Sequence, residues 1–232
     1  MHCSNLIPQL IESSYFSEQK HKLVRISEFL RAPDTAIEQA RLQKFAAITP
    51  QYPGIRAGLD RATSDQWLEA LSPILTNEFE RPIHGWEMQA WFSLVTKPPH
   101  ALLPIQCLPH VDGTNPTQIA LMVYLHHTSH GGTAFFRHKA TGLESLTDET
   151  FPVYKRQLEK DVAQDGLPPK AYVTDGAPYF ERTHKVDAIF NTAVLYRGNI
   201  FHSGVIEDAP LSDDPAQGRL TINAFFRAKG SS

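Results

Sequence analysis

From Trp86 onward the sequence consists of short apolar segments separated by turn residues, and this pattern limits the possible folds more than any other feature. The segments are MQAWFSLV, QIALMVYL, TAFF, AIFNTAVLY, IFHSGVI and RLTINAFF, with Gly, Pro, Asn and Asp between them. Short apolar segments bounded by turn formers are typical of β-strands. We therefore expect residues 86–228 to form an all-β unit, either a barrel or a two-sheet jelly roll.

Residues 1–85 show a different pattern and are expected to be mainly helical. The segments APDTAIEQARLQKF and SDQWLEALSPILTNEF carry apolar residues at helical spacing, with Asp34 and Ser64 as candidate N-caps. A chain of 232 residues with 41% hydrophobic residues can form one sizeable core. We therefore expect a single domain, residues 1–232, in which residues 1–85 give helical support to the β-unit.

Residues 139–180 interrupt the β pattern. Within them, FPVYKRQLEKDVAQDG at 151–166 has helical spacing and many charges, and Gly and Pro residues lie on both sides of it. This pattern predicts an insertion that contains one helix.

Charge and cysteine content exclude several classes of protein. Lys and Arg total 22 against 25 Asp and Glu, so the chain lacks the basic excess of a general nucleic-acid binder. No apolar run approaches the ~18 residues of a membrane-spanning helix, and the start of the sequence does not resemble a signal peptide. Cys3 and Cys107 are too few for a disulfide framework. We expect a cytoplasmic protein with reduced thiols and no membrane partner.

A candidate metal site begins at the segment QCLPHVDGT. His110 and Asp112 lie two residues apart, which on a strand places both side chains on one face. His202 in NIFHSGV can supply a second imidazole, and two His with one carboxylate form the set that binds Fe(II) with open coordination positions. A solvent-facing His-Asp pair is the alternative for His110 and Asp112. The cluster of His126, His127 and His130 in LHHTSHGG is interpreted as solvated loop histidines.

The last apolar segment, QGRLTINAFF, adds a candidate anion site. Strand alternation places Arg219, Thr221, Asn223, Phe225 and Arg227 on one face and the apolar residues between them on the other. An arginine can bind a carboxylate through two hydrogen bonds, and a hydroxyl two residues later can add a third. This face suits a barrel interior that holds an anionic ligand.

These motifs occur in an order that resembles the Fe(II)/2-oxoglutarate-dependent dioxygenase superfamily, most closely its prolyl-hydroxylase-like branch and a bacterial family within it. The ordered set is HVD at 110–112, the strand ending VYL at 123–125, GGTAFF at 131–136, His202, and Arg219-x-Thr221. The resemblance implies a mainly β fold with flanking helices, with a double-stranded β-helix (jelly roll, cupin-like) core and an N-terminal helical buttress. One departure is the interval of 17 residues from His202 to Arg219, which contains a polar loop.

The resemblance also implies roles for individual residues. His110, Asp112 and His202 would bind Fe(II), while Arg219 would pair with the distal carboxylate of the co-substrate 2-oxoglutarate. Thr221 would assist Arg219, and Tyr124 is a further candidate donor to the co-substrate. The implied reaction hydroxylates a C–H bond of a peptide side chain, an amino acid or a small metabolite, and converts 2-oxoglutarate to succinate.

Two other classes of function remain open at this stage. One is a non-catalytic jelly-roll module that binds a metal, and the other is a cupin-like metalloenzyme that does not use 2-oxoglutarate. Neither needs Arg219 and Thr221 deep in a barrel. We also expect residues 139–180 to cover the iron site, and Arg197 and Asn199 to lie near its rim.

Overall fold

The computed structural model describes residues 10–79, 85–127, 131–207 and 211–229, and within these ranges the protein is mainly β with three α-helices. The described helices include none that is long and apolar enough to cross a membrane. The helices are α1 (Pro33–Arg41), α2 (Arg61–Phe79) and α3 (Phe151–Asp165). The strands are β1 (Leu10–Phe16), β2 (His21–Ser27), β3 (Gly54–Gly58), β4 (Trp86–Val95), β5 (Ile119–Tyr124), β6 (Gly132–His138), β7 (Gly176–Ala177), β8 (Phe180–Asp187), β9 (Thr192–Arg197), β10 (His202–Val205) and β11 (Leu220–Ala228).

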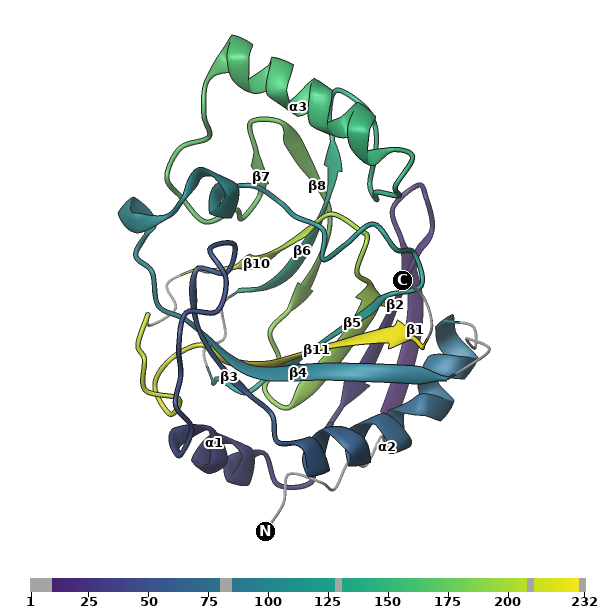
Figure 1. Ribbon diagram of the computed structural model, residues 1–232, viewed down its shortest axis with the longest axis vertical. Helices are drawn as coiled ribbons and strands as arrows, with labels where there is room; N and C mark the ends of the chain where they lie inside the picture. Colours follow the sequence, from purple (N-terminus) through teal and green to yellow (C-terminus); the bar gives the residue numbers. More distant parts are fainter. Residues whose placement is uncertain (1–9, 80–84, 128–130, 208–210, 230–232) are drawn as a thin grey trace.

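The strands form two antiparallel sheets. The larger sheet has the order β1-β2-β9-β5-β11-β4-β3, and the smaller has the order β10-β6-β8-β7. In Figure 1, α1 and α2 lie on one side of the larger sheet, and α3 lies at the opposite end of the molecule beyond the smaller sheet. The expected mainly β class with flanking helices is confirmed.

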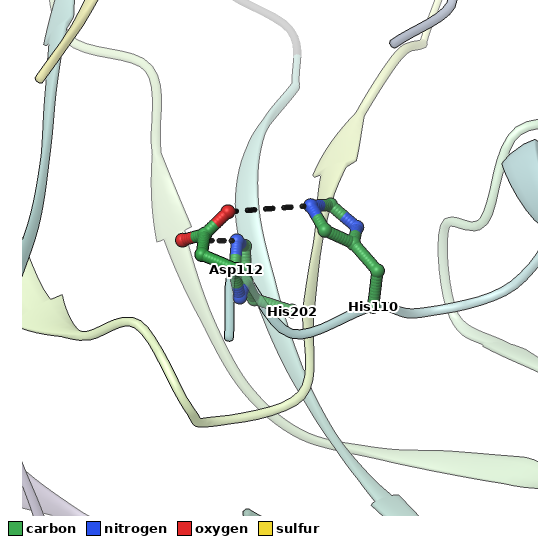
Figure 2. Close-up of side chains that lie close together, drawn as sticks. All are labelled: His110, Asp112 and His202. Carbon is green, nitrogen blue, oxygen red and sulfur yellow. Dashed lines mark ion pairs between the residues drawn. The ribbon is translucent and has the colours of Figure 1, made fainter. Parts of the chain in front are cut away.

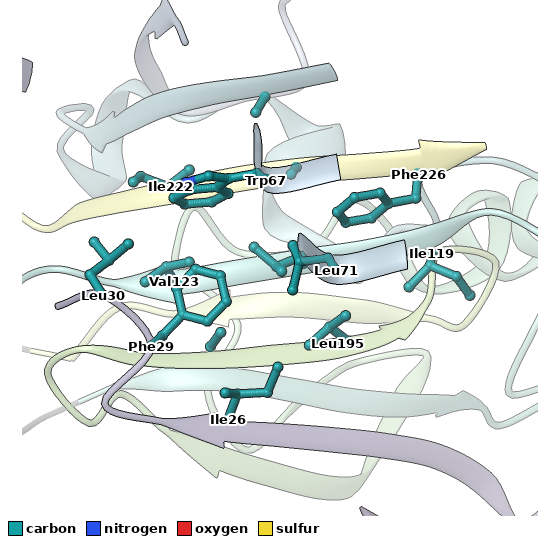
Figure 3. Packing of buried hydrophobic residues seen from close by; sticks show 14 of the residues in the cluster. Ile26, Phe29, Leu30, Trp67, Leu71, Ile119, Val123, Leu195, Ile222 and Phe226 are labelled. Atoms are coloured by element: carbon teal, nitrogen blue, oxygen red, sulfur yellow. The ribbon is translucent and has the colours of Figure 1, made fainter. Parts of the chain in front are cut away.

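The main hydrophobic core lies between the larger sheet and helices α1 and α2. Trp67 and Leu71 of α2 pack on alternate residues of the strands, including Val123 and Ile222 (Figure 3). On β11 the buried residues that face this core are Leu220, Ile222, Ala224 and Phe226, as strand alternation predicts. The opposite face of β11 is thereby left to face the smaller sheet.

A second core fills the space between the two sheets. Ala120, Tyr124 and Tyr196 of the larger sheet pack there with Phe135 and Val186 of the smaller sheet. At the other side of the smaller sheet, α3 packs on a third cluster through Tyr154, and Leu158 adds a partly buried contact. Each sheet therefore has apolar residues on both faces, which is the arrangement of stacked layers.

The insertion contains the expected helix, α3, which is fixed to the smaller sheet by a polar pair. His138 of β6 is fully buried, and its Nε2 lies 3.3 Å from Oδ2 of Asp161 on α3. Nδ1 of His138 lies 2.9 Å from the hydroxyl of Thr141. The helix is thus attached to the outer face of the smaller sheet, away from the space between the sheets.

The expectation that residues 1–85 are mainly helical support is wrong in one respect, because three strands also lie there. β1 and β2 form a hairpin that joins the larger sheet at β9, and β3 pairs with β4 along its whole length. The alternation in β2 is a local strand signal, but GIRAG of β3 is too short to be recognised without its partner. The two predicted helices are present. Asp60 rather than Ser64 caps α2, accepting hydrogen bonds from the backbone N–H and the hydroxyl of Thr63.

At the start of α1 the N-cap is Ala32 and Pro33 occupies the first turn, so Asp34 lies within the helix instead of capping it. Cys107 is buried and free, as expected for a reduced thiol, whereas Cys3 lies outside the described residues.

Replacing Leu71 with alanine should lower the free energy of unfolding by about 2–5 kcal/mol, because it leaves a cavity between α2 and the larger sheet. Leu71 is fully buried. Urea denaturation followed by circular dichroism measures this change. Gln66→Ala, at an exposed position of the same helix, is the control and should change stability by less than about 0.5 kcal/mol. Equal effects of the two substitutions would contradict this description of the core.

Candidate metal centre

A short backbone ladder brings the two candidate histidines together. The N–H of His110 donates to the carbonyl of His202 at 2.9 Å, and the N–H of His202 donates to the carbonyl of His110 at 2.8 Å. Two residues later, the N–H of Asp112 donates to the carbonyl of Gly198 at 2.7 Å. The segment before β5 is therefore aligned with β10 of the smaller sheet, although 92 residues of sequence separate the histidines.

The side chains of these three residues point toward one another (Figure 2). Oδ1 of Asp112 lies 3.9 Å from Nε2 of His110, and Oδ2 of Asp112 lies 3.4 Å from Nε2 of His202. One donor atom from each residue can be chosen so that all three lie within 4.8 Å of one another. Among the described residues, this is the one group of three His, Cys, Asp or Glu side chains with such spacing.

Hydrogen bonding at His202 shows that the site suits a cation. Nδ1 of His202 lies 2.8 Å from the carbonyl of Ile200, so this nitrogen carries the proton and Nε2 has a free lone pair in the neutral ring. Oδ2 of Asp112 is buried and has no hydrogen-bond partner among the described residues. Two acceptors therefore face each other, and a positive charge between them removes their repulsion. Two imidazole nitrogens and one carboxylate are the donor set of the Fe(II) facial triad, so these residues fit that ion.

The protein surroundings favour the neutral forms of two members of the set. Burial raises the pKa of Asp112, and electrostatic interactions with His202, Arg56 and Arg227 oppose this rise. Displacement of water lowers the pKa of His110 well below its ordinary value, and electrostatic interactions with His202 and Arg56 lower it further. The side chain of His110 is 52% exposed, but it faces a cavity lined by protein. The low pKa keeps the imidazole of His110 unprotonated and able to bind a metal.

The three residues lie in the wall of a cavity of about 370 Å³. Arg219 and Thr221 of the predicted anion site line the same cavity. Other lining residues come from the segment before β3, from β3 itself, and from the loop before β5. The structure thus brings the predicted metal ligands and the predicted anion site into one space.

Arg219 is buried in that space without a carboxylate partner among the described residues. Its side chain is 3% exposed, and its one hydrogen bond within the described residues runs from NH2 to the carbonyl of Gly132 at 3.1 Å. The Nε atom is buried and has no hydrogen-bond partner there. Burial lowers the pKa of Arg219, yet a guanidinium stays charged in proteins. A buried cation of this kind is costly unless an anion pairs with it, so Arg219 favours an anionic ligand.

Thr221 of β11 lies directly opposite Tyr124 of β5, but Thr221 lines the cavity and Tyr124 does not. Thr221 lines it and donates its hydroxyl proton to Oδ1 of Asn223 at 2.9 Å. Tyr124 is fully buried between the sheets, its hydroxyl lies 2.8 Å from that of Thr133, and it is absent from the cavity wall. Burial raises the pKa of Tyr124 to about 12. Tyr124 therefore lies behind the residues that line the cavity.

Several cavity residues were not identified from the sequence. These are Tyr52, Arg56, Tyr172 and Tyr196. Tyr196 packs edge-on against the ring of His202, with ring centroids 4.9 Å apart, and so orients this imidazole. Alternation along β9 places Tyr196 on the inner face and could have indicated it, whereas Arg56 lies in a segment that reads as a turn.

The other histidines and the expected rim residues have structural roles. His126 is buried rather than solvated, and burial lowers its pKa to about 3, with the nearby charge of Arg219 acting in the same direction. His127 stacks on Phe190, and His130 lies outside the described residues. Arg197 donates to the carbonyl of Pro116 at 2.5 Å, and Asn199 is buried and donates to the carbonyl of Leu146 at 2.9 Å.

The expectation that residues 139–180 cover the iron site is wrong for most of this segment. α3 packs on the outer face of the smaller sheet, and Tyr172 is the one residue of the segment that lines the cavity. The hydroxyl of Tyr172 donates to the carbonyl of Lys97 at 2.6 Å. The physical reason is the apolar outer face of β6, β8 and β10, which has to be covered, and α3 covers it.

The fold is similar to those of solved structures that are described with 2-oxoglutarate, also called alpha ketoglutarate. The chain matches HygX from Streptomyces hygroscopicus with nickel and 2-oxoglutarate bound, at a TM-score of 0.53 and 12% identity over 90% of this chain and 84% of that one. It also matches the non-heme alpha ketoglutarate dependent epimerase SnoN from nogalamycin biosynthesis, at a TM-score of 0.52 and 11% identity over 90% of this chain and 78% of that one. At such identities the likeness concerns the fold alone.

Comparison with curated proteins gives no match. Comparison with family models gives a match to the "Family of unknown function (DUF6445)" over residues 9–226, which include every strand, helix and candidate site residue described above except the last two residues of β11. Because this match spans most of the sequence, the chain belongs to the DUF6445 family.

Proposed function

We propose that the protein is an Fe(II)- and 2-oxoglutarate-dependent oxygenase that hydroxylates a C–H bond of a peptide side chain, an amino acid or a small metabolite. The observation that carries this proposal is the convergence of His110, Asp112 and His202 in the wall of a cavity that also contains the buried Arg219. A module that only binds metal has no use for such a cation. The same holds for a metalloenzyme without an anionic co-substrate.

The fold is consistent with this proposal. Two facing antiparallel sheets with a shared core are the arrangement from which we infer a double-stranded β-helix. HygX has been solved with nickel and 2-oxoglutarate bound, and also with iron bound, so a chain of similar fold can bind a metal and this co-substrate. The family model of residues 9–226 names no activity.

In this proposal each side chain has one task. His110, Asp112 and His202 hold Fe(II), and the hydrogen bond from His202 to the carbonyl of Ile200 fixes which ring nitrogen faces the metal. Arg219 pairs with the distal carboxylate of 2-oxoglutarate, with Thr221 beside it. When bound, Fe(II) and 2-oxoglutarate supply the oxidising power for hydroxylation from O₂, with succinate and CO₂ as products.

The apolar part of the cavity wall has a separate task. Val95, Leu108, Met122 and Phe225 line the space beside the polar residues and limit its water content. Exclusion of water strengthens the electrostatic interactions made by Arg219 and Asp112, because the local dielectric constant is lower. It also protects a reactive site from side reactions.

The metal assignment predicts that Asp112→Ala will weaken Mn(II) binding, measured by isothermal titration. The loss should exceed the ~10–100-fold effect of removing a supporting hydrogen bond, because a direct ligand is lost. Asp175→Ala is a matched control, since that carboxylate is 82% exposed and pairs with Arg182 away from the cavity. Unchanged affinity in Asp112→Ala would rule out the site.

The co-substrate assignment predicts that Arg219→Met will weaken 2-oxoglutarate binding by about 2–4 kcal/mol, because a buried carboxylate loses a charge-assisted partner. Binding is measured by titration of the Mn(II)-loaded protein, and affinity for Mn(II) itself should not change. Arg227→Met is the control on the same strand, because Arg227 donates to Gln118 at 3.1 Å and does not line the cavity. If Arg227→Met alone abolishes binding, the assignment to Arg219 is wrong.

A further inference from the structure

Arg56 is a second arginine of the cavity wall, and neither the metal nor the co-substrate assignment uses it. It lies on β3, the edge strand of the larger sheet. The registers place Arg56 opposite Ser93 of β4, and Ser93 opposite Thr221 of β11. Residues directly opposite on neighbouring strands share a face, so Arg56, Ser93 and Thr221 form a row along the cavity side of the sheet.

Aromatic rings hold the guanidinium of Arg56 in position. Its Cζ lies 4.0 Å from the centroid of the Tyr52 ring and 5.8 Å from that of Trp91. Contacts of this kind orient a guanidinium through its face and leave its edge available for hydrogen bonds. The side chain is therefore pre-organised toward the cavity.

The charge of Arg56 is not neutralised by a neighbouring carboxylate. No ion pair of Arg56 occurs within the described ranges of the chain, and its Nε is buried without a hydrogen-bond partner there. Burial lowers the pKa of Arg56, and electrostatic interactions with Tyr52 and Asp112 oppose this shift. Asp112 is the one acidic side chain that the described part of the chain contributes to the cavity wall, and the proposed function commits it to the metal.

The sum of the charges in the filled cavity shows that one positive charge has no assigned anion. Among the described residues of the wall, Arg56, Arg219 and Asp112 are the ionic side chains other than the histidines. With Fe(II) and the 2-oxoglutarate dianion added, the two arginines and the metal bring four positive charges against three negative ones. One positive charge remains, and the side chain without an assigned anion is Arg56. A singly charged anion restores neutrality, whereas a phosphate dianion overcompensates.

We propose that Arg56 is a substrate-binding residue and that the primary substrate carries a carboxylate, which Arg56 binds through two hydrogen bonds. This inference rests on the proposed function, since it defines the substrate class of the same site. Arg56 rather than Arg219 is assigned to the substrate because it lies on an edge strand and is half-buried, whereas Arg219 is enclosed. Arg56 lines the same cavity as His110 and Asp112, so a substrate held by Arg56 shares that space with the proposed metal ligands.

Trp91 provides a direct readout of an anion at Arg56. The chain has three tryptophans, of which Trp67 and Trp86 are buried and Trp91 is half-buried. Iodide, an anionic quencher of fluorescence, should therefore act mainly on Trp91 and should be concentrated there by Arg56. The protein is first loaded with Zn(II) and N-oxalylglycine, an unreactive analogue of 2-oxoglutarate, so that Arg219 is occupied.

In the loaded protein, Arg56→Met should lower the quenching constant for iodide by about threefold, because one local positive charge is removed. Quenching by neutral acrylamide should stay the same. Acetate at constant ionic strength should protect the wild-type protein from iodide, and acetamide should not. Arg25→Met, on β2 of the same sheet and outside the cavity, is the matched control and should behave as the wild type.

Arg56→Lys keeps the positive charge but changes the geometry of the hydrogen-bond donors, so it separates these two effects. It also provides a test if Arg56→Met fails to fold. It should keep most of the iodide effect but lose most of the protection by acetate, because an ammonium lacks the planar fork of a guanidinium. Equal iodide quenching in wild type, Arg56→Met and Arg56→Lys would overturn the proposal. Protection by inorganic phosphate that exceeds that by acetate would overturn the carboxylate assignment.

Failure of this inference can be told apart from failure of the proposed function. If Arg56→Met loses N-oxalylglycine binding while Arg219→Met retains it, Arg56 binds the co-substrate and the substrate assignment is wrong, although the oxygenase proposal stands. If the wild-type protein binds neither Zn(II) nor N-oxalylglycine, the oxygenase proposal fails. The iodide and acetate measurements on the unloaded protein then still decide whether Arg56 binds a carboxylate.

Discussion

The pair of backbone hydrogen bonds between His110 and His202 is the constraint on which the site depends. It links the irregular segment before β5 to the edge strand of the smaller sheet, and so places both imidazoles at the junction of the two sheets. The bond from Asp112 to Gly198 continues this alignment and brings the carboxylate beside the imidazoles. Because these contacts use main-chain atoms, the geometry of the site is set by the fold before any side chain binds a ligand.

One face of the larger sheet packs in the main hydrophobic core, and its other face contributes residues to the candidate site. The residues on one face of β11 pack under α2, while Thr221 and Asn223 on its other face, and Arg219 directly before the strand, line the cavity. The apolar packing fixes the register of β11 against β4 and β5, since a slip by one residue would place Arg219 in the hydrophobic core. The position of the charged groups in the cavity is therefore stabilised by the packing of their apolar neighbours.

Much of the candidate site could be predicted because its signals are local. His110 and Asp112 lie two residues apart, and the alternation of β11 is visible in nine consecutive residues. Arg56 could not be predicted, because GIRAG has no strand signal until β4 pairs with it. The position of α3 was also predicted incorrectly, since its sequence indicates a helix but does not indicate which apolar surface the helix covers.

The sequence by itself determined six strand segments between Trp86 and Ala228, the three helices, the order of the polar motifs and the inner face of β11. These features follow from residue spacing within single elements, which the chain carries without tertiary contacts. Tertiary structure alone decided that β1, β2 and β3 extend the larger sheet, that Tyr124 lies behind the cavity wall, and that Arg56 faces the same space as Arg219. The reason is that pairing between distant strands and burial between layers depend on partners far apart in the sequence, and no local pattern specifies them.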